Sequence, residues 1–304
     1  MKTQFSLTLG LVILAANANA KLNVVATTPD LAAIAQEIGG KQVEITTLAR
    51  PSEDPHFVDA KPSFIVKLNK ADVLLEGGAE LEIGWLPPLL AGTRNAKIAA
   101  GTAGNVRCNE GVQMLEMPTA LDRSQGDIHA AGNPHFMVDP VNAGIAAHHI
   151  ADAFAKLDPT QAAFYQANLK KFAAALDAKL AEWQKKFEPL KGARIAAYHN
   201  SWPYFAKRFG LQIDVFLEPK PGIPPSPAHL AAVIARMKEQ KVKVVFHDPY
   251  FDHKRAESVA SATGAVVVEV TQYPGGVKGS EGGYIQMMDY LVNTVSQALV
   301  HQAE

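Results

Sequence analysis

Three histidines lie in loop sequences of the kind that follow strands or lead into helices. His56 stands in the turn-rich segment PSEDPHF, His135 in GNPHFMVDP, and His199 in AYHNSWPYF, directly after an apolar run. In open α/β sheets, ligands bind outside the carboxyl ends of the strands, where such loops gather. Imidazole nitrogen is a good ligand for zinc and other transition metals. A histidine in a turn is also commonly a solvated or hydrogen-bonded residue, so the three form a metal site only if the fold brings them together.

The residues around these histidines indicate binding rather than catalysis. Three histidines and a water also describe a catalytic zinc site, which needs a general base beside the open position. The chain contains no HxH or HExxH pair, and no glutamate stands directly beside any of the three histidines. We therefore predict that the protein is not an enzyme, with a zinc-dependent hydrolase as the rival interpretation.

Strand-like and helix-like segments alternate in both halves of the chain. Such alternation predicts parallel βαβ units. We expect strands at 22–28, 43–49, 72–78 and 97–101 in the first half, and at 194–199, 211–218, 243–249 and 265–270 in the second. The expected helices are 31–39, 61–71, 202–210, 227–240 and 254–264, followed by a last helix near the C-terminus. The fold class predicted is α/β, with two Rossmann-like lobes that each contain a parallel sheet.

A long amphipathic segment separates the two halves. After Pro159 it carries apolar residues at helical spacing and no internal glycine or proline as far as residue 188. A helix of about 28 residues is roughly 40 Å long, enough to run along both lobes. The expected organisation is a signal peptide at 1–20, an N-terminal lobe at 21–157, the long interdomain helix at 158–188 and a C-terminal lobe at 189–304.

The N-terminus has the features of a secretory signal. Lys2 is followed by the apolar stretch FSLTLGLVILAA and by Ala18-Asn19-Ala20, a small-x-small cleavage pattern. The stretch is shorter than the ~20 residues of a membrane-spanning helix, and no cysteine near the cleavage point offers a lipid attachment site. We predict a periplasmic protein without stable membrane insertion. A net charge of −1 without a basic run argues against a nucleic-acid partner.

Four motifs together resemble the metal-specific solute-binding proteins of ABC importers. They are DPHF followed by KPS, then GNPHFMVDP, YHNSWPYFAKRFG and GGVKGSEGGYIQMMDYL, and the likeness covers nearly the whole mature chain. The resemblance implies a monomer that holds a metal ion between its two lobes and delivers it to a membrane permease. It also implies that His56, His135 and His199 bind the ion. Family members with histidine at the position of His199 resemble zinc carriers, and those with glutamate there resemble manganese or iron carriers. Zinc is therefore the expected cargo, with manganese or iron as the alternative. A surface adhesin is a weaker rival interpretation.

Two departures from the family pattern leave the ligand set incomplete. Where many members supply an aspartate ligand, this chain reads VTQYPGG, so the fourth ligand is Asp248, Tyr273, a water or none. We expect Asp248 to cap a helix or to orient an imidazole. The long His/Asp/Glu-rich loop of many zinc carriers is replaced by LDRSQGDIHAAG, in which His129 is either solvated or a transient contact for the ion.

Other polar residues near the motifs receive supporting roles. Asp139 is expected to cap the helix that follows NPHFMV, and Glu53 and Asp54 are expected to make the potential near His56 more negative. The histidines that flank Asp248, at positions 247 and 253, are expected to be surface residues.

Overall fold

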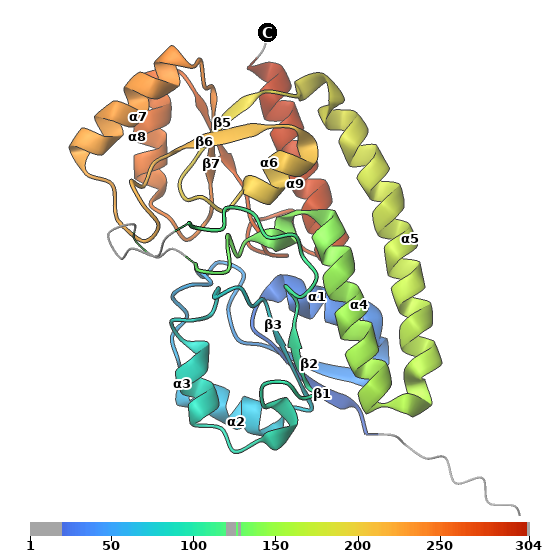
Figure 1. The fold of residues 1–304 in the computed structure, drawn as a ribbon. Coiled ribbons are helices and arrows are strands. Elements are labelled where there is room, and N and C mark those ends of the chain that lie inside the picture. Colours follow the sequence, from blue (N-terminus) through green and yellow to red (C-terminus); the bar gives the residue numbers. More distant parts are fainter. Residues whose placement is uncertain (1–19, 120–125, 127–128, 303–304) are drawn as a thin grey trace, which may run out of the picture.

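The fold is built on two parallel four-stranded sheets (Figure 1). The computed structural model describes residues 20–119, 126 and 129–302. The sheets have the orders β2-β1-β3-β4 and β6-β5-β7-β8, so each chain half crosses over in the same way. In the first sheet the strands are β1 (Leu22–Ala26), β2 (Val43–Thr47), β3 (Val73–Glu76) and β4 (Asn105–Arg107), and in the second they are β5 (Arg194–Ala197), β6 (Gln212–Phe216), β7 (Val244–His247) and β8 (Val266–Glu269). In each sheet the strand order reverses between two neighbouring strands, β1 and β3 in the first sheet and β5 and β7 in the second. Open α/β sheets bind ligands at such a switch point.

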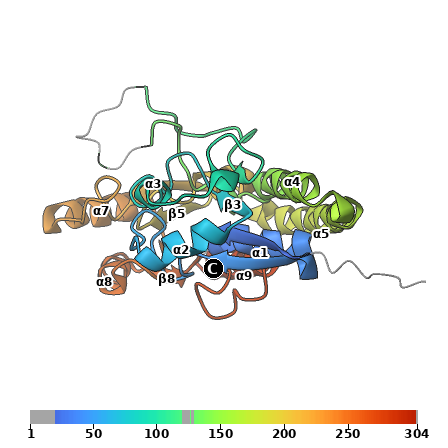
Figure 2. The same cartoon turned by 90° about the horizontal axis from the view of Figure 1, so that it is seen from below.

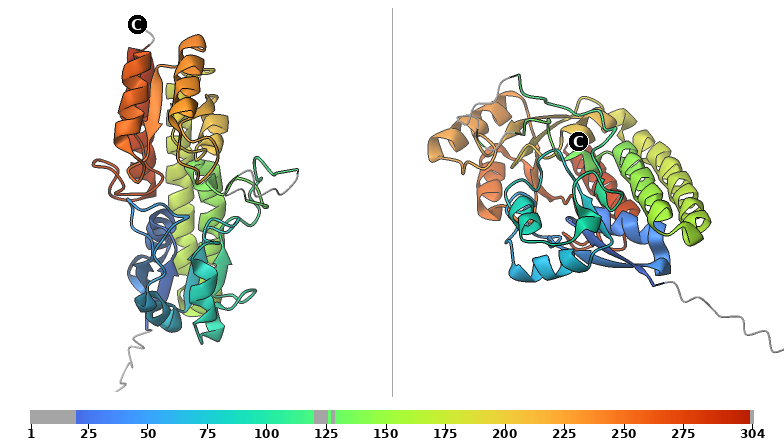
Figure 3. Two further views of the ribbon diagram at one scale, coloured as in Figure 1. Left: turned by 90° about the vertical axis from the view of Figure 1, so that its left-hand side faces the viewer. Right: turned by 60° about the horizontal axis from the view of Figure 1, so that its bottom comes forward.

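Helices cover both faces of each sheet, as the views from below and from the side show (Figures 2 and 3). Those of the first half are α1 (Pro29–Gly39), α2 (Pro62–Lys70), α3 (Leu86–Ala91) and α4 (Pro140–Leu157). Those of the second half are α6 (Pro203–Phe209), α7 (Pro227–Glu239), α8 (His253–Thr263) and α9 (Tyr284–His301). Short 3-10 turns are η1 (Gly40–Gln42), η2 (Ala96–Ile98) and η4 (Phe136–Val138). The α/β class with two parallel sheets is as predicted.

One long helix runs beside both sheets (Figure 1). It is α5 (Ala162–Phe187), which η5 (Pro159–Gln161) precedes and η6 (Glu188–Leu190) follows. Its 26 residues span about 39 Å at 1.5 Å each, close to the predicted length. Its buried side chains are Tyr165, Leu169, Phe172, Leu176, Trp183 and Phe187. The aromatic stripe therefore packs into the core, as expected for an amphipathic helix.

One of three apolar core clusters among the described residues contains residues of both sheets. It includes Val24 of β1, Phe246 of β7, Phe172 of α5 and Leu291 of α9. Polar contacts reinforce the α5–α9 packing, since the Trp183 indole N–H donates to Asp289 Oδ1 at 2.8 Å. Moving the lobes apart would expose this core to water, which costs about 25 cal/mol per Å² of apolar surface. We therefore expect local rearrangements to be easier than a large hinge motion.

The sequence-based prediction was wrong at one strand. Residues 97–101 do not form a strand, because η2 occupies Ala96–Ile98 and the fourth strand is β4, farther along the chain. The side chain of Asn95 caps the turn by accepting from the Lys97 N–H at 3.0 Å and donates to the Leu68 and Ala71 carbonyls. This local cap competes with an extended conformation. β4 has only three residues, NVR, and no apolar alternation that identifies it.

The predicted signal peptide lies outside the described residues, apart from Ala20. Within residues 20–119, 126 and 129–302, every helix is too short or too polar to span a bilayer.

Candidate metal centre

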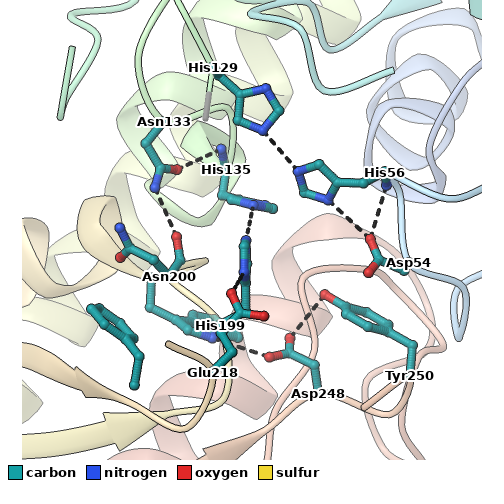
Figure 4. A network of polar contacts seen from close by, with 12 residues as sticks. Asp54, His56, His129, Asn133, His135, His199, Asn200, Glu218, Asp248 and Tyr250 are labelled. Atoms are coloured by element: carbon teal, nitrogen blue, oxygen red, sulfur yellow. Dashed lines mark hydrogen bonds and ion pairs between the residues drawn. The ribbon is translucent and has the colours of Figure 1, made fainter. Parts of the chain in front are cut away.

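The fold brings His56, His135 and His199 together (Figure 4). His56 lies in the loop between β2 and α2, His135 immediately precedes η4, and His199 follows β5. Each offers a ring nitrogen that lies within 4.8 Å of the other two. The Nε2 atoms of His135 and His199 are 3.3 Å apart, and the three ring centroids are separated by 5.0 to 5.6 Å. The geometry is therefore that of a ligand cluster at the carboxyl ends of strands from both sheets.

Two of the imidazoles are oriented by carboxylates. His56 Nδ1 donates to Asp54 Oδ1 at 3.0 Å, and the same oxygen accepts from the backbone N–H of His56. His199 Nδ1 donates to Oε1 of Glu218, and both of these residues are buried. A carboxylate can only accept, so Nδ1 carries the proton and the Nε2 lone pair is free to bind a metal.

The third imidazole is oriented by an amide. His135 Nδ1 donates to Oε1 of Gln272 at 2.9 Å, while Gln272 Nε2 donates to the hydroxyl of Tyr250 at 2.8 Å. The Tyr250 hydroxyl in turn donates to Asp248 at 3.4 Å, and the Trp202 indole N–H reaches the other oxygen at the same distance. Asp248 therefore anchors a buried hydrogen-bond chain that ends on His135. All three histidines thus present Nε2 to a common point.

Burial and charge shift the pKa values in this centre. Burial lowers the pKa of His135 well below its usual value, and the neighbouring imidazoles lower it further. Burial also acts to lower the pKa of His199, but the hydrogen bond and charge of Glu218 outweigh it and raise that pKa. Burial raises the pKa of Asp248 to about 7. At neutral pH His135 is therefore in the neutral form that a metal requires.

His129 lies against the cluster rather than in solvent. Its Nε2 is 3.2 Å from Nε2 of His56, and the two ring centroids are 5.1 Å apart (Figure 4). A backbone hydrogen bond to Glu80 holds the ring, and the Ala130 N–H donates to the Glu80 carboxylate at 2.6 Å. Burial, with the nearby His56 and His199, lowers the pKa of His129 to about 4. The ring is therefore neutral beside His56 at neutral pH.

Two hollows reach the cluster from outside. The larger, of about 420 Å³, is lined by His129, His135, His199 and the loop residues Pro219 and Pro221. The smaller, of about 180 Å³, is lined by residues that include His56, His199 and Pro221. The proline-rich loop at 219–227 contains a bridge between Lys220 and Ile223. This loop therefore lies over the approach to the metal centre.

Hydrogen bonds between the two halves hold His135 and His199 in position. Asn133 Nδ2 donates to the Asn200 carbonyl at 2.8 Å, and the Tyr204 hydroxyl donates to the Asn133 carbonyl at 2.8 Å. The Arg208 guanidinium forms a bidentate pair with Asp139 at 2.7 and 2.9 Å. The same Asp139 caps α4, as predicted, by accepting from the Val141 N–H at 3.0 Å. These hydrogen bonds between the two halves therefore help to position the cluster.

Of the two roles expected for Asp248, the structure supports the orientation of an imidazole, through Tyr250 and Gln272. Asp248 does not cap α8, because this helix begins at His253 and Asp252 is its N-cap. The expectation for His247 was wrong. His247 is not a surface residue, since only 4% of it is exposed. Side chains alternate between the two faces of a strand, and at position 247 the side chain points to the face that α8 covers. His247 is therefore buried rather than exposed.

Sequence reasoning missed Glu218, Gln272 and Tyr250 as residues that shape the centre. Glu218 was visible only as the acidic last residue of a predicted apolar strand. In VTQYPGG the residue expected near the metal was Tyr273, whereas the side chain that contacts His135 is that of the preceding residue, Gln272. Tyr273 is buried, with its backbone N–H bonded to Thr271 Oγ1. No short motif marks these roles, because each depends on loops from different parts of the chain.

The chain matches a known family over residues 24–298, and the description of that family is "Zinc-uptake complex component A periplasmic". The chain belongs to this family. Its members are metal-binding solute-binding proteins of ABC importers, so the protein acts outside the cytoplasm as a binding component and not as an enzyme. A divalent metal ion as cargo and an ABC permease as partner follow from the family.

Individual relatives bind different metals according to their names. The chain is 29% identical to the iron-binding protein YfeA of Yersinia pestis, over 91% of this chain and 86% of that protein. It is 24% identical to the manganese ABC transporter substrate-binding lipoprotein PsaA of Streptococcus mitis, over 98% of each. Zinc, manganese and iron are therefore all represented among the family and these relatives.

Solved structures share the fold. A crystal structure of ZnuA has a TM-score of 0.78 and 25% identity, covering 92% of this chain and 99% of that one. A zinc-bound deletion mutant of ZnuA lacking 138–173 has a TM-score of 0.77 and 26% identity, covering 91% and 98%. The Mn²⁺ complex of FpvC from Pseudomonas aeruginosa has a TM-score of 0.77 and 23% identity, covering 92% and 99%. The two sheets and the long helix between them are therefore those of this class of binding protein.

Proposed function

We propose that this protein captures zinc in the periplasm and delivers it to the membrane permease of its importer. The observation that carries the proposal is the convergence of His56, His135 and His199, each with Nδ1 bonded to an oxygen acceptor. Fixed tautomers leave three Nε2 lone pairs directed at one point, which is the arrangement of a histidine-rich zinc site.

The donor set supports zinc over manganese. The three clustered ligand atoms are imidazole nitrogens, which suit zinc, whereas manganese prefers carboxylate and carbonyl oxygen. The carboxylates of Asp54 and Glu218 accept hydrogen bonds from imidazole Nδ1 atoms and so act on the ligands. Copper and nickel also accept imidazole, so metal supply in the envelope contributes to selection.

We further propose that His129 is the fourth ligand. In a tetrahedral zinc site with bonds of about 2.0–2.1 Å, neighbouring nitrogens lie about 3.3 Å apart. The Nε2 atoms of His129 and His56 are separated by 3.2 Å, and those of His135 and His199 by 3.3 Å. His129 has no ring nitrogen within 4.8 Å of all three other ligand atoms, so its ring must move toward His135 and His199 to complete the site. The ion then binds the two Nε2 lone pairs of His129 and His56, whose Nδ1 atoms donate to the Glu80 backbone and to Asp54.

Because interlobe hydrogen bonds already hold His135 beside His199, loading does not require large movement of the lobes. We expect the loaded and empty forms to differ in the segment that carries His129 and in the proline-rich loop at 219–227. These segments line the larger hollow above the cluster. A local change of this kind gives the permease a surface by which to distinguish the two forms.

Competitive titration of the chelator-stripped mature protein with zinc, manganese, iron(II), nickel and copper tests the cargo. We expect tight zinc binding that His199→Ala weakens by at least 100-fold, with manganese bound far more weakly than zinc. His301→Ala, at the exposed end of α9, is the matched control and should bind like the wild type. Preferential binding of manganese or iron would overturn the assignment of zinc.

The fourth-ligand assignment is tested by His129→Ala. Water takes the vacated position in that variant, so we expect a loss of zinc affinity about 10- to 100-fold, smaller than that of His199→Ala. An unchanged zinc affinity would show that His129 is not a ligand. Release of the mature protein by osmotic shock tests the periplasmic location.

A further inference from the structure

A second group of potential ligands lies where β7 and β8 end and α8 begins. His247 is the last residue of β7, His253 is the first of α8, and Glu269 is the last of β8. Each offers an atom within 4.8 Å of the others. His247 and Glu269 are directly paired across the two parallel strands. The group shares no residue with the histidine cluster between the lobes.

The His247 side chain is buried with a free lone pair. Its Nε2 lies 3.1 Å from the Phe251 carbonyl, which can only accept, so Nε2 carries the proton. Nδ1 is therefore an acceptor, and it is buried without a hydrogen-bond partner. A buried polar atom without a partner costs about 1–3 kcal/mol, so such atoms are rare in folded proteins. A ring anchored through one nitrogen to a backbone carbonyl, with the other nitrogen free, is the usual state of a metal-binding histidine.

His253 faces this ring with a second unpartnered nitrogen. The two ring centroids are 4.7 Å apart at an interplanar angle of 72°. The His253 side chain is 41% exposed, yet its Nε2 is buried and forms no hydrogen bond. Glu257 brings a carboxylate oxygen to 3.6 Å from that nitrogen. Two neighbouring imidazoles therefore carry unused nitrogens close to the carboxylates of Glu257 and Glu269.

We propose that His247 Nδ1, His253 Nε2 and the Glu269 carboxylate form a second binding site for a divalent transition-metal ion. Two imidazoles and one carboxylate suit zinc and its neighbours, with water completing the coordination. Ligand atoms on such an ion lie about 3.3 Å apart, so the group must contract from its present spread. The exposed Glu269 side chain is free to move inward, and Glu257 adds negative charge near the ion.

The position of the site indicates a role in holding the second lobe together. An ion there would connect the ends of β7 and β8 to the first turn of α8, three segments otherwise joined by loops. β8 is the edge strand of its sheet, with a single neighbouring strand. Because an ion that binds only the folded protein stabilises it, zinc should raise the unfolding temperature through this site. Cargo capture at His56, His135 and His199 does not depend on it.

Zinc stoichiometry and thermal unfolding of the full mature protein test this inference. Chelator-stripped wild type should bind two equivalents of zinc, and His253→Ala one. His56→Ala/His199→Ala should also bind one equivalent, and zinc should still raise its unfolding temperature. Adding His253→Ala or Glu269→Gln to that double variant should abolish both effects. His229→Ala, a histidine of α7 whose ring bonds to the Phe216 carbonyl, is the matched control and should leave the second equivalent intact.

The outcomes separate the two sites. One equivalent in the wild type and none in His56→Ala/His199→Ala would overturn the second site while leaving the cargo site in place. A second equivalent that survives both His253→Ala and Glu269→Gln would also overturn it, because the ion would then lie elsewhere. One equivalent in the wild type that His253→Ala removes would support the second site and contradict the cargo site.

Discussion

Glu218→Gln should weaken zinc binding although Glu218 itself is not a ligand. The carboxylate accepts the Nδ1 proton of His199, and only 6% of Glu218 and 9% of His199 are exposed. Glutamine keeps the shape and one acceptor oxygen but removes the charge. A hydrogen bond to a charged group contributes about 1.5–3 kcal/mol, against about 0.5–1.5 kcal/mol for a neutral one. The difference of about 1–2 kcal/mol makes His199 a weaker ligand.

That difference corresponds to a rise in the zinc dissociation constant of roughly 5- to 30-fold, which overlaps the range of about 10- to 100-fold for residues that orient metal ligands. Competition with a chromophoric chelator at pH 8 measures it directly. Glu116→Gln is the matched control, because Glu116 binds Asn133 and Asn200 beside the cluster, and neither partner is an imidazole. Its dissociation constant should stay within about threefold of the wild type.

The pH profile adds a signature that a general loss of structure would not give. Glu218 raises the pKa of His199, so in the wild type a proton competes with zinc for this ring as the pH falls. Glutamine removes that effect, and the gap between variant and wild type should narrow from pH 8 to pH 6. Equal zinc affinity of Glu218→Gln and wild type at pH 8 would refute the reasoning, as would a loss equal to that of Glu116→Gln.

Three further measurements test the remaining parts of the argument. Because the pKa of His199 is raised and its neutral form binds, wild-type zinc affinity should fall from pH 8 to pH 6; a flat profile would contradict a site that depends on this ring. Asp139→Asn keeps an oxygen that can cap α4 but loses the charge that faces Arg208, so the free energy of unfolding in urea should fall by about 1–3 kcal/mol. An unchanged free energy of unfolding would show that the Asp139–Arg208 pair does not stabilise the fold. Phe172→Ala should cost about 3–5 kcal/mol in the same assay, and a loss below 1 kcal/mol would contradict a shared core.

The main elements of the fold were readable because strong local patterns coincide with them. Seven of the eight expected strands overlap observed ones, since each is a short segment rich in apolar residues between turn signals. The long helix followed from apolar spacing uninterrupted by glycine or proline. The exception was β4, whose three residues NVR are held in the sheet by pairing with Leu74, Leu75 and Glu76. A strand stabilised only by its neighbour leaves no periodic signal in the sequence.

Some residues of the candidate site were also predictable from the sequence, and others were not. Residue type and loop position singled out His56, His135 and His199, and the structure places them together; that they bind an ion remains a proposal. The contact of His129 with His56 was not readable, because a lone histidine in a polar loop gives no sign of what it touches. Asp248 was expected to cap a helix or to orient an imidazole, and it lies in the buried network that reaches His135.

What the sequence determined by itself is the order of its elements and the chemical types of its ligands, because periodicity, turn residues and imidazole are local properties of the chain. What only tertiary structure decided is the set of partners: Glu218 beside His199, Gln272 beside His135, and a second histidine pair where β7 ends and α8 begins. These pairs are separated by 19 and 137 residues in the two hydrogen-bonded cases. Contacts over such separations follow from sheet order and side-chain alternation, which the folded chain alone defines.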